Sequence, residues 1–423
     1  MKVNTRNQLI FLIFLSAFFI RWGFVVFYPG GKMLSQEVLC DDGYKYDQWA
    51  MNILNHGCLQ LSIKDALGEL FPSPFPLYSI FLSVVYFIFG HNLVILRLVQ
   101  AALGALTCIV VYFLAKEVSE DETVSLISAI IMALHYPSVT AVGYVMTESL
   151  FTLILVCAAL LLIRAVKSPR SFLYWLCGLC WGLAALCRPV IWGFAPVLAV
   201  YVSYVLLRHK AGFIKYFFLF ILGISLALVP WSARNYKVYG IFTPAFGGGF
   251  GLYLGNSPLA TGGSGGWDSP QDVRVEKDIE QRYHKLSPLE LDSLFRRRAV
   301  EFVINNPRRV IILAMKKFIN MWRPYYDTAR PANRIIYVAT DLLFIFPYSI
   351  AGMVICRRKR IYTLFYLLVG YYIFIHMILV SLLRFRLPLM PFLAIFAACI
   401  LKKIFERIGL EKAAGLKTRH NYR

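Results

Sequence analysis

Acidic side chains stand at two places where this apolar chain has few charges. Asp41, Asp42 and Asp47 follow the first apolar stretch, and Glu148 interrupts the apolar sequence between two later stretches. Ionisable groups near a bilayer are costly, so such positions indicate function by default. One carboxylate of such a set can act as the general base toward a hydroxyl group. A second can share the acid–base work or position a substrate.

A structural role competes with this interpretation at each acid. Tyr46 and Ala50 are one helical turn apart, which predicts a juxtamembrane helix whose dipole favours an acid in its first turn. The helix-dipole role accounts well for one of the three aspartates, but it accounts less well for the presence of three. For Glu148 the structural interpretation is a favourable position in the first turn of the next span, which Thr147 would cap. This interpretation and a functional role have similar weight from this residue alone. The predicted position of Glu148 on the same membrane side as Asp42 favours function.

Arginines accompany the acids on that predicted outer side, where positive charge is usually scarce. They are Arg188, Arg234, Arg384 and Arg386. A guanidinium fork matches the oxygens of a phosphate group. Anchoring of helix ends is the commoner use of one such residue, but the set as a whole favours chemistry on a phosphate-bearing lipid.

The composition is that of a membrane protein. The 423 residues are 59% hydrophobic and 16% charged, and the mean hydropathy is +0.62. A net charge of +21 would suggest nucleic acid on a soluble protein. Here the basic residues cluster in short loops and the tail, as the positive-inside rule requires, so we expect membrane lipids and no nucleic acid as partners.

Apolar periodicity and loop charge predict an all-α polytopic bundle of about ten transmembrane helices with both termini cytoplasmic. The protein is thus expected in the cell (inner) membrane as a multi-pass chain. Segment 76–90 is short and follows three prolines, and a crossing there would place the basic loops outside. We therefore interpret it as an interfacial helix. The apolar segments lie near 8–28, 76–90, 93–115, 122–140, 147–164, 171–187, 190–207, 213–232, 333–356, 361–382 and 387–405.

Three regions follow from this topology. Residues 1–232 form a transmembrane catalytic module that includes the outer loop 29–92. Residues 233–332 form a second outer loop with a glycine-rich segment and amphipathic helices. Residues 333–423 add the last spans and a basic cytoplasmic tail.

Local signals inside the second outer loop are specific. Ser287 and Glu290 have the spacing of a capping box, and the helix they start is expected to end near Asn305. The amphipathic helix after it should run to about Trp322, with Lys316 and Lys317 on its polar face.

Cysteine and histidine give weaker signals. Cys40 and Cys58 share the first outer loop, which leaves a disulfide open. Cys177 and Cys180 form a CxxC inside an apolar helix and are interpreted as packing residues. The histidines lack metal-ligand spacing, and the sequence leaves open whether a divalent metal takes part.

Several motifs occur in an order that resembles a known family. The resemblance is to the GT-C superfamily of membrane glycosyltransferases, in the branch of dolichyl-phosphate-mannose–protein mannosyltransferases and aminoarabinose transferases. The motifs are the first-loop acids with Tyr46, Ala50 and Gly57, then Pro74-Phe75-Pro76-Leu77-Tyr78, Arg97, Thr147-Glu148-Ser149-Leu150-Phe151, the stretch from Gly182 to Pro189, the stretch from Pro230 to Tyr236, Gly255-Asn256, and the stretch from Arg386 to Phe392.

The resemblance implies a polyprenyl-phosphate sugar donor, inverting transfer on the outer face and an acidic base, for which Asp42 is the best match. Relatives that use aminoarabinose carry a basic residue beside the proline-rich motif, and this chain has none there. Phosphate binding would then rest on the arginines, or the donor differs. Tyr44, Tyr46, Tyr144 and Asn256 are the expected contacts of the sugar or of a glycan, lipid or protein acceptor.

Two other classes of function compete. A transporter or flippase of lipid-linked sugars would need polar residues through the membrane midplane and usually inverted repeats, and the sequence has few such charges and no repeat. A non-catalytic scaffold of the cell envelope would tolerate loss of the carboxylates.

Overall fold

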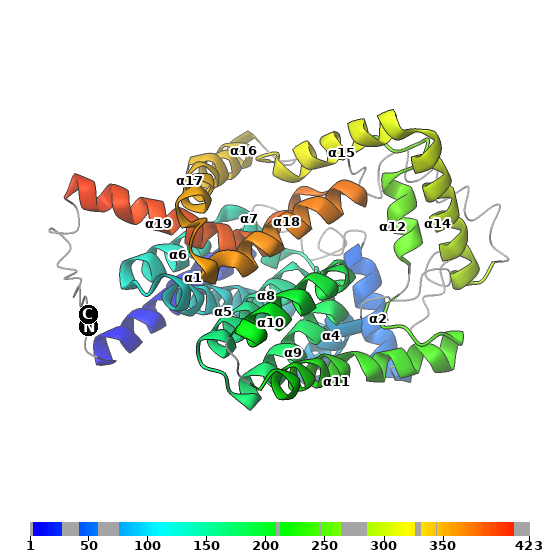
Figure 1. The fold of residues 1–423 in the computed structure, drawn as a ribbon, viewed down its shortest axis with the longest axis horizontal. Coiled ribbons are helices and arrows are strands. Elements are labelled where there is room, and N and C mark those ends of the chain that lie inside the picture. The colour runs from blue at the N-terminus through cyan, green and yellow to red at the C-terminus, as the bar shows by residue number, and fades with distance from the viewer. Residues whose placement is uncertain are drawn as a thin grey trace.

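The computed structural model describes residues 3–27, 42–57, 76–208, 212–245, 247–263, 286–325, 331–343 and 345–409. All regular structure within these ranges is helical (Figure 1). The predicted all-α class is therefore confirmed. Asp41, Cys40, Cys58 and the tail after residue 409 lie outside the described residues.

The membrane-spanning helices are those that are both long and apolar. Eight in the described ranges pass this test, and the pair α6–α7, bent by 56°, makes a ninth. The tenth span expected from the sequence corresponds to α9, a shorter apolar helix. The first half of the bundle comprises α1 Val3–Phe27, α5 Leu93–Ser119, α6 Glu122–Leu134, α7 Tyr136–Thr140 with the 3₁₀ turn η2 Ala141–Gly143, α8 Glu148–Lys167, α9 Ser171–Cys187, η3 Pro189–Phe194, α10 Ala195–Arg208 and α11 Phe213–Tyr239.

The second half of the bundle contains an irregular span. Within the span 333–356, which the sequence predicts as an apolar segment, the backbone is α-helical in α16, π-helical in η4 and α-helical again in α17. Helices α17 and α19 pack directly against each other. The elements are α16 Pro331–Val338, η4 Ala339–Leu343, α17 Phe346–Cys356, η5 Arg360–Tyr362, α18 Thr363–Ile378, η6 Leu383–Leu389 and α19 Met390–Ile408.

Shorter helices cover one end of the bundle. Figure 1 shows α12 and α14 at the end opposite to the start of α1 and the end of α19. Helix α2 packs on α4, α12 on α14, and α15 on α18. The predicted capping box is confirmed at Ser287 and Glu290. Their bounds are α2 Asp42–His56, α4 Pro76–Phe89, α12 Gly248–Gly255, α14 Pro288–Asn305 and α15 Pro307–Trp322.

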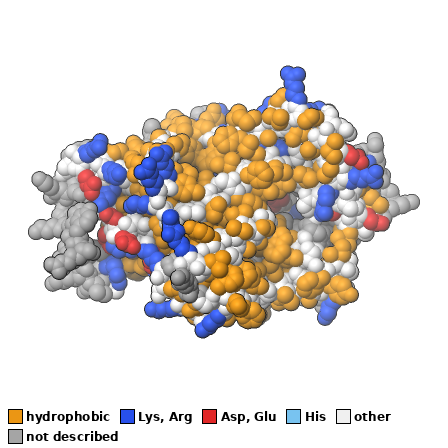
Figure 2. Space-filling model, viewed as in Figure 1, with side chains coloured by type: hydrophobic (Ala, Val, Ile, Leu, Met, Phe, Trp, Pro, Cys, Tyr) orange, Lys and Arg blue, Asp and Glu red, His pale blue; other side chains and the backbone are white. Residues whose placement is uncertain are grey.

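The surface is divided as a bilayer requires. Figure 2 shows a wide hydrophobic middle, while most charged side chains gather toward the two ends of the molecule. Large apolar side chains are exposed on the helices, among them Phe87, Val200 and Ile214, which are 82%, 71% and 81% exposed. Such exposure is favourable only where lipid replaces water.

Helices α9 and α11 cross at glycines. A Cβ on Gly178 would lie 2.0 Å from the carbonyl oxygen of Phe220, and one on Gly223 would lie 2.2 Å from that of Trp175. Backbones approach this closely in membranes only through small residues. We expect Gly178→Val to separate the two helices and to destabilise the protein by about 1–3 kcal/mol, the usual cost of overpacking. Thermal unfolding in detergent tests this, and Gly370→Val, where a Cβ would meet nothing within 4 Å, is the control.

Candidate active site

Helix α2 carries Asp42 into contact with a residue from the far end of the chain. Asp42 occupies the first turn of α2, as the sequence predicts. Nη2 of Arg384, in η6, donates a hydrogen bond to Asp42 Oδ2 at 2.6 Å. The side chains of Asp42 and Arg384 are 29% and 21% exposed, so the pair remains open to a ligand.

Glu148 joins the same group from the start of α8. Its Oε1 lies 3.4 Å from Nη2 of Arg188 and 3.7 Å from Nε of Arg384. Glu148 is 3% exposed, and its Oε2 has no hydrogen-bond partner among the described residues. A buried acceptor without a partner is costly. Glu148 therefore carries an acceptor that the described residues leave uncompensated.

An aromatic ring packs against both arginines of the group. Phe385 faces both guanidinium groups, with its ring centroid 5.2 Å from Arg188 and 5.6 Å from Arg384. The ring of Phe151 lies 5.8 Å from the Arg188 guanidinium on another side. Cation–π contacts hold a guanidinium in place while its N–H groups stay available. The sequence analysis missed Phe385, although its position between two arginines was a usable signal.

Tyr46 lies beside these charges. Burial raises the pKa of Tyr46, and the nearby carboxylate of Asp42 raises it further. The phenol thus stays neutral and can donate a hydrogen bond. Its ring makes an edge-on contact with Tyr78, 5.1 Å away. Tyr44, by contrast, is 47% exposed on the same helix.

Gln100 connects this aromatic pair to the segment before Glu148. Its side-chain oxygen accepts a hydrogen bond from the Tyr78 hydroxyl at 2.7 Å, and its Nε2 donates to the backbone oxygen of Tyr144 at 2.9 Å. Tyr144 therefore lies near the group that contains Glu148. Gln100 had no sequence signal that distinguished it from other polar residues in a span.

Asp47 faces away from this group. Its carboxylate is 2% exposed and accepts hydrogen bonds from the Tyr86 hydroxyl at 2.6 Å and from His91 Nε2 at 2.9 Å. These contacts fasten α2 to α4 and to the turn after it. The structure therefore does not bring Asp47 together with Asp42 and Glu148.

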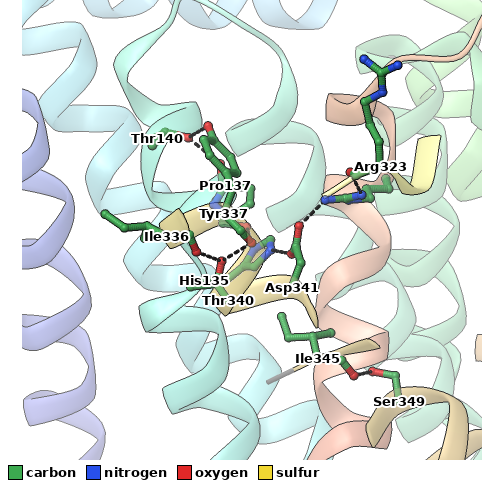
Figure 3. A network of polar contacts seen from close by, with 12 residues as sticks. His135, Pro137, Thr140, Arg323, Ile336, Tyr337, Thr340, Asp341, Ile345 and Ser349 are labelled. Carbon is green, nitrogen blue, oxygen red and sulfur yellow. Dashed lines mark hydrogen bonds and ion pairs between the residues drawn. The ribbon is translucent and has the colours of Figure 1, made fainter. Parts of the chain in front are cut away.

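Arg386 is enclosed by protein. Its guanidinium is 0% exposed and donates to the backbone oxygens of Met321 and Arg323 and to Asp341. Figure 3 shows Asp341 facing His135 within this network. The sequence analysis grouped Arg386 with Arg384 as a phosphate ligand, but the structure directs the two side chains to different places.

Arg234 contacts neighbouring side chains of its own helix. It is 7% exposed, contacts the side chain of Asn235, and lies 4.8 Å from the Trp231 ring and 5.2 Å from the Tyr239 ring. These contacts stay within α11.

Asn256 is tied to a buried lysine. Its Nδ2 donates to the backbone oxygen of Ile378 at 2.7 Å, and its Oδ1 accepts from Nζ of Lys317 at 3.2 Å. Lys317 is 2% exposed, although the amphipathic pattern of α15 predicts it on the polar face with Lys316. The prediction for Lys317 was wrong because the end of α12 covers that position.

Lys317 gives the protein a measurable pH dependence. Burial lowers its pKa to about 8, whereas an unfolded lysine titrates near 10.4. Between these values the unfolded state binds more protons, so this group makes the protein more stable as pH rises from about 8 to 10. We expect the melting temperature to rise more over this interval in the unmodified protein than in Lys317→Met. Equal changes in the two proteins would contradict this.

No cluster for a metal ion is found in the described ranges, where no group of three or more His, Cys, Asp or Glu side chains is suitably placed. The structure therefore does not test whether a divalent metal takes part.

Comparison with known structures defines the class of fold. The crystal structure of the Archaeoglobus fulgidus oligosaccharyltransferase, in complex with zinc and sulfate, matches 96% of this chain and 50% of its own, with a TM-score of 0.51 and 14% identity. ArnT from Cupriavidus metallidurans bound to undecaprenyl phosphate matches with a TM-score of 0.42 and 14% identity, over 96% of this chain and 81% of its own. The protein is an all-α membrane protein with a GT-C-like fold, as predicted.

Comparison of sequences then identifies the family that it resembles. Residues 72–234 match the family model described as dolichyl-phosphate-mannose-protein mannosyltransferase. The resemblance expected from the motifs is confirmed over this segment, which includes Glu148, Arg188 and Arg234. An uncharacterized protein of Aquifex aeolicus is 28% identical over 170 residues, or 40% of this chain. The chain spans about a third of the length of that relative (34%).

Proposed function

We propose that the protein transfers a sugar from a polyprenyl-phosphate donor to an acceptor hydroxyl, with inversion, on the outer face of the membrane. One observation carries the proposal: Asp42, Glu148, Arg188 and Arg384 meet at one place although they come from four separate segments. Two carboxylates and two guanidinium groups supply a base and a phosphate site. The family that residues 72–234 match is described by its dolichyl-phosphate-linked donor, a polyprenyl phosphate.

The reaction is a single displacement. An oxygen of the acceptor attacks the anomeric carbon, the bond from that carbon to the phosphate oxygen breaks, and the polyprenyl phosphate leaves with the electron pair. Asp42 takes the proton of the acceptor hydroxyl as general base. Arg384 and Arg188 stabilise the negative charge that grows on the phosphate. Glu148 orients the sugar or the acceptor through its unpaired oxygen.

The pairing of Asp42 with Arg384 suggests how the donor prepares the base. An entering phosphate competes for the Arg384 guanidinium, since both anions match its fork. A carboxylate that loses this partner gains freedom to accept a proton. Donor binding and activation of the base would thus be one event, and Tyr46 is placed to donate to either anion.

Charge and shape support the remaining parts of the proposal. The group lies at the start of α8, whereas Arg164 and Lys167 lie in its last turn. By the positive-inside rule, this charge distribution supports an outer position for the group and an inner position for the two termini. An apolar groove of about 520 Å³ between α10 and α18 suits the polyprenyl chain, and its lining is Pro196, Val197, Val200, Tyr201, Tyr204 and Leu367.

The experiment is reconstitution of the purified protein in liposomes with a panel of polyprenyl-phosphate sugars and a mixed acceptor extract. Release of polyprenyl phosphate together with labelled product supports the transferase. Movement of intact donor across the bilayer without cleavage would contradict the transferase and support the flippase. A covalent adduct between sugar and protein would contradict the single displacement.

A further inference from the structure

The 3₁₀ segment η6 presents two arginines in different directions. Arg384 contacts Asp42 and lies near Glu148, while Arg386, two residues later, is buried against other elements. Apolar side chains of η6 pack on α8 and α15, and Arg386 adds a charged attachment to this packing. The placement of Arg384 in the candidate active site therefore depends in part on what holds Arg386.

Asp341 is the charged partner of Arg386. Both side chains are 0% exposed, and Arg386 Nη2 donates to Asp341 Oδ2. The Arg386 guanidinium also lies 5.0 Å from the ring of Phe346. Removing one partner of a buried pair leaves a charge without compensation, which makes such a pair a strong constraint. Asp341 therefore fixes η6 to the span 333–356.

The other oxygen of Asp341 holds the segment that leads to Glu148. Asp341 Oδ1 lies 3.0 Å from Nε2 of His135 (Figure 3). Nδ1 of His135 lies 2.7 Å from the hydroxyl of Ser138. His135 stands at the bend between α6 and α7, and α7 and η2 continue from it toward Glu148.

A neighbouring contact strengthens this attachment. The hydroxyls of Thr140 and Tyr337 are 3.0 Å apart, and the rings of Tyr136 and Tyr337 meet edge-on at 4.9 Å. Tyr337 stands four residues before Asp341. Two successive turns of the span 333–356 thus hold the segment 135–140.

The backbone around Asp341 is unusual. Residues Ala339–Leu343 form a π-helical turn, centred on Asp341 within a membrane-spanning segment. Such turns occur frequently at functional sites, and a buried intramembrane carboxylate indicates function by default. No contact between Asp341 and the four residues of the candidate active site is present, so any role in the reaction is indirect.

We propose that Asp341 is a positioning residue. Its two oxygens hold the two halves of the candidate active site at a fixed separation, with η6 and Arg384 on one side and the segment from His135 to Glu148 on the other. The result is the 3.7 Å separation between Arg384 and Glu148. This inference rests on the proposed transferase function, because positioning matters only if these groups react.

A double-mutant cycle tests whether Asp341 acts through Arg384. Asp341→Asn keeps the shape and removes the charge, and a shift of about 1 Å at a reacting group costs up to about 10²-fold in rate. We expect turnover to fall by about 10–100-fold in the unmodified background and by less than about threefold in Arg384→Gln, since coupled residues are not additive. Equal factors in both backgrounds would overturn the proposal.

A milder variant covers the case in which Asp341→Asn fails to fold. His135→Leu leaves the Asp341–Arg386 pair in place and frees only the segment toward Glu148. The same cycle with His135→Leu is expected to show the same lack of additivity. Ser349→Ala is the matched control, because Ser349 is a buried polar residue of the same span that donates to the backbone oxygens of Ile345 and Leu393. It should leave turnover unchanged.

Hydrogen–deuterium exchange supplies a measurement that needs no substrate. Asp341→Asn should speed exchange by about tenfold in both 382–389 and 141–148, and Ser349→Ala in neither. Faster exchange in only one segment, or in none, would overturn the proposal. If the unmodified protein cleaves no donor, the transferase proposal fails, and the exchange result still decides whether Asp341 joins the two segments.

Discussion

Replacement of Asp42 by asparagine is expected to lower the rate of donor turnover by about 10²–10⁴-fold, the range that one acid–base group contributes. The amide keeps the size of the side chain and can still meet Arg384, but it cannot take a proton from the acceptor. The rate constant should fall with little change in donor KM. Single-turnover release of polyprenyl phosphate measures this directly.

The same helix offers a matched comparison. Asp47→Asn changes the same residue type on α2, but the Asp47 carboxylate meets Tyr86 and His91 instead of the arginines. We expect Asp47→Asn to lower the melting temperature. The turnover per folded molecule should fall far less than in Asp42→Asn. Full activity in Asp42→Asn together with loss in Asp47→Asn would exchange the roles of the two residues.

Replacement of Arg384 by glutamine has the second largest expected effect, a loss of about 10²–10³-fold in turnover, as for other donors that stabilise a developing negative charge. Arg384 approaches both Asp42 and Glu148, so its loss also leaves two carboxylates near each other without their shared cation. Donor KM should rise as well. Arg384→Lys should recover part of the rate, because it restores the charge without the fork.

Arginines elsewhere provide the controls for this prediction. Arg297→Gln removes an exposed ion pair with Glu301 on α14, and such pairs contribute little. Its turnover should match that of the unmodified protein. Arg234→Gln tests another arginine that the sequence predicts as a phosphate ligand. A greater loss in Arg234→Gln than in Arg384→Gln would move the donor phosphate to α11.

Local signals made much of the fold predictable. The spacing of one helical turn between Tyr46 and Ala50 predicted α2, and the capping box at Ser287 predicted the start of α14. These elements depend on residues within a few positions of one another. Apolar length predicted the spans in the same way. Whether α9 is counted as a tenth span depends on the minimum length required of a span.

Contacts between distant parts of the chain could not be predicted from the sequence. Asp42 and Arg384 are 342 positions apart, and no periodicity relates them. Arg384 and Arg386 share one motif, but a 3₁₀ segment points residues two apart in different directions, so their separate roles required the structure. The π-helical turn at Asp341 ends four residues before Pro347, which has no backbone N–H to donate to residue 343, so the sequence held a local signal for this break. The contacts that Asp341 makes there still required the structure.

We propose that the donor phosphate binds between Arg188 and Arg384 with its sugar toward Asp42. Cryo-electron microscopy of the protein with a non-cleavable polyprenyl-phosphonate sugar would locate both groups. We expect phosphonate density within hydrogen-bond distance of both guanidinium groups, with the anomeric carbon on the side of Asp42. Phosphonate density beside Arg234, or a sugar remote from Asp42 and Glu148, would contradict it.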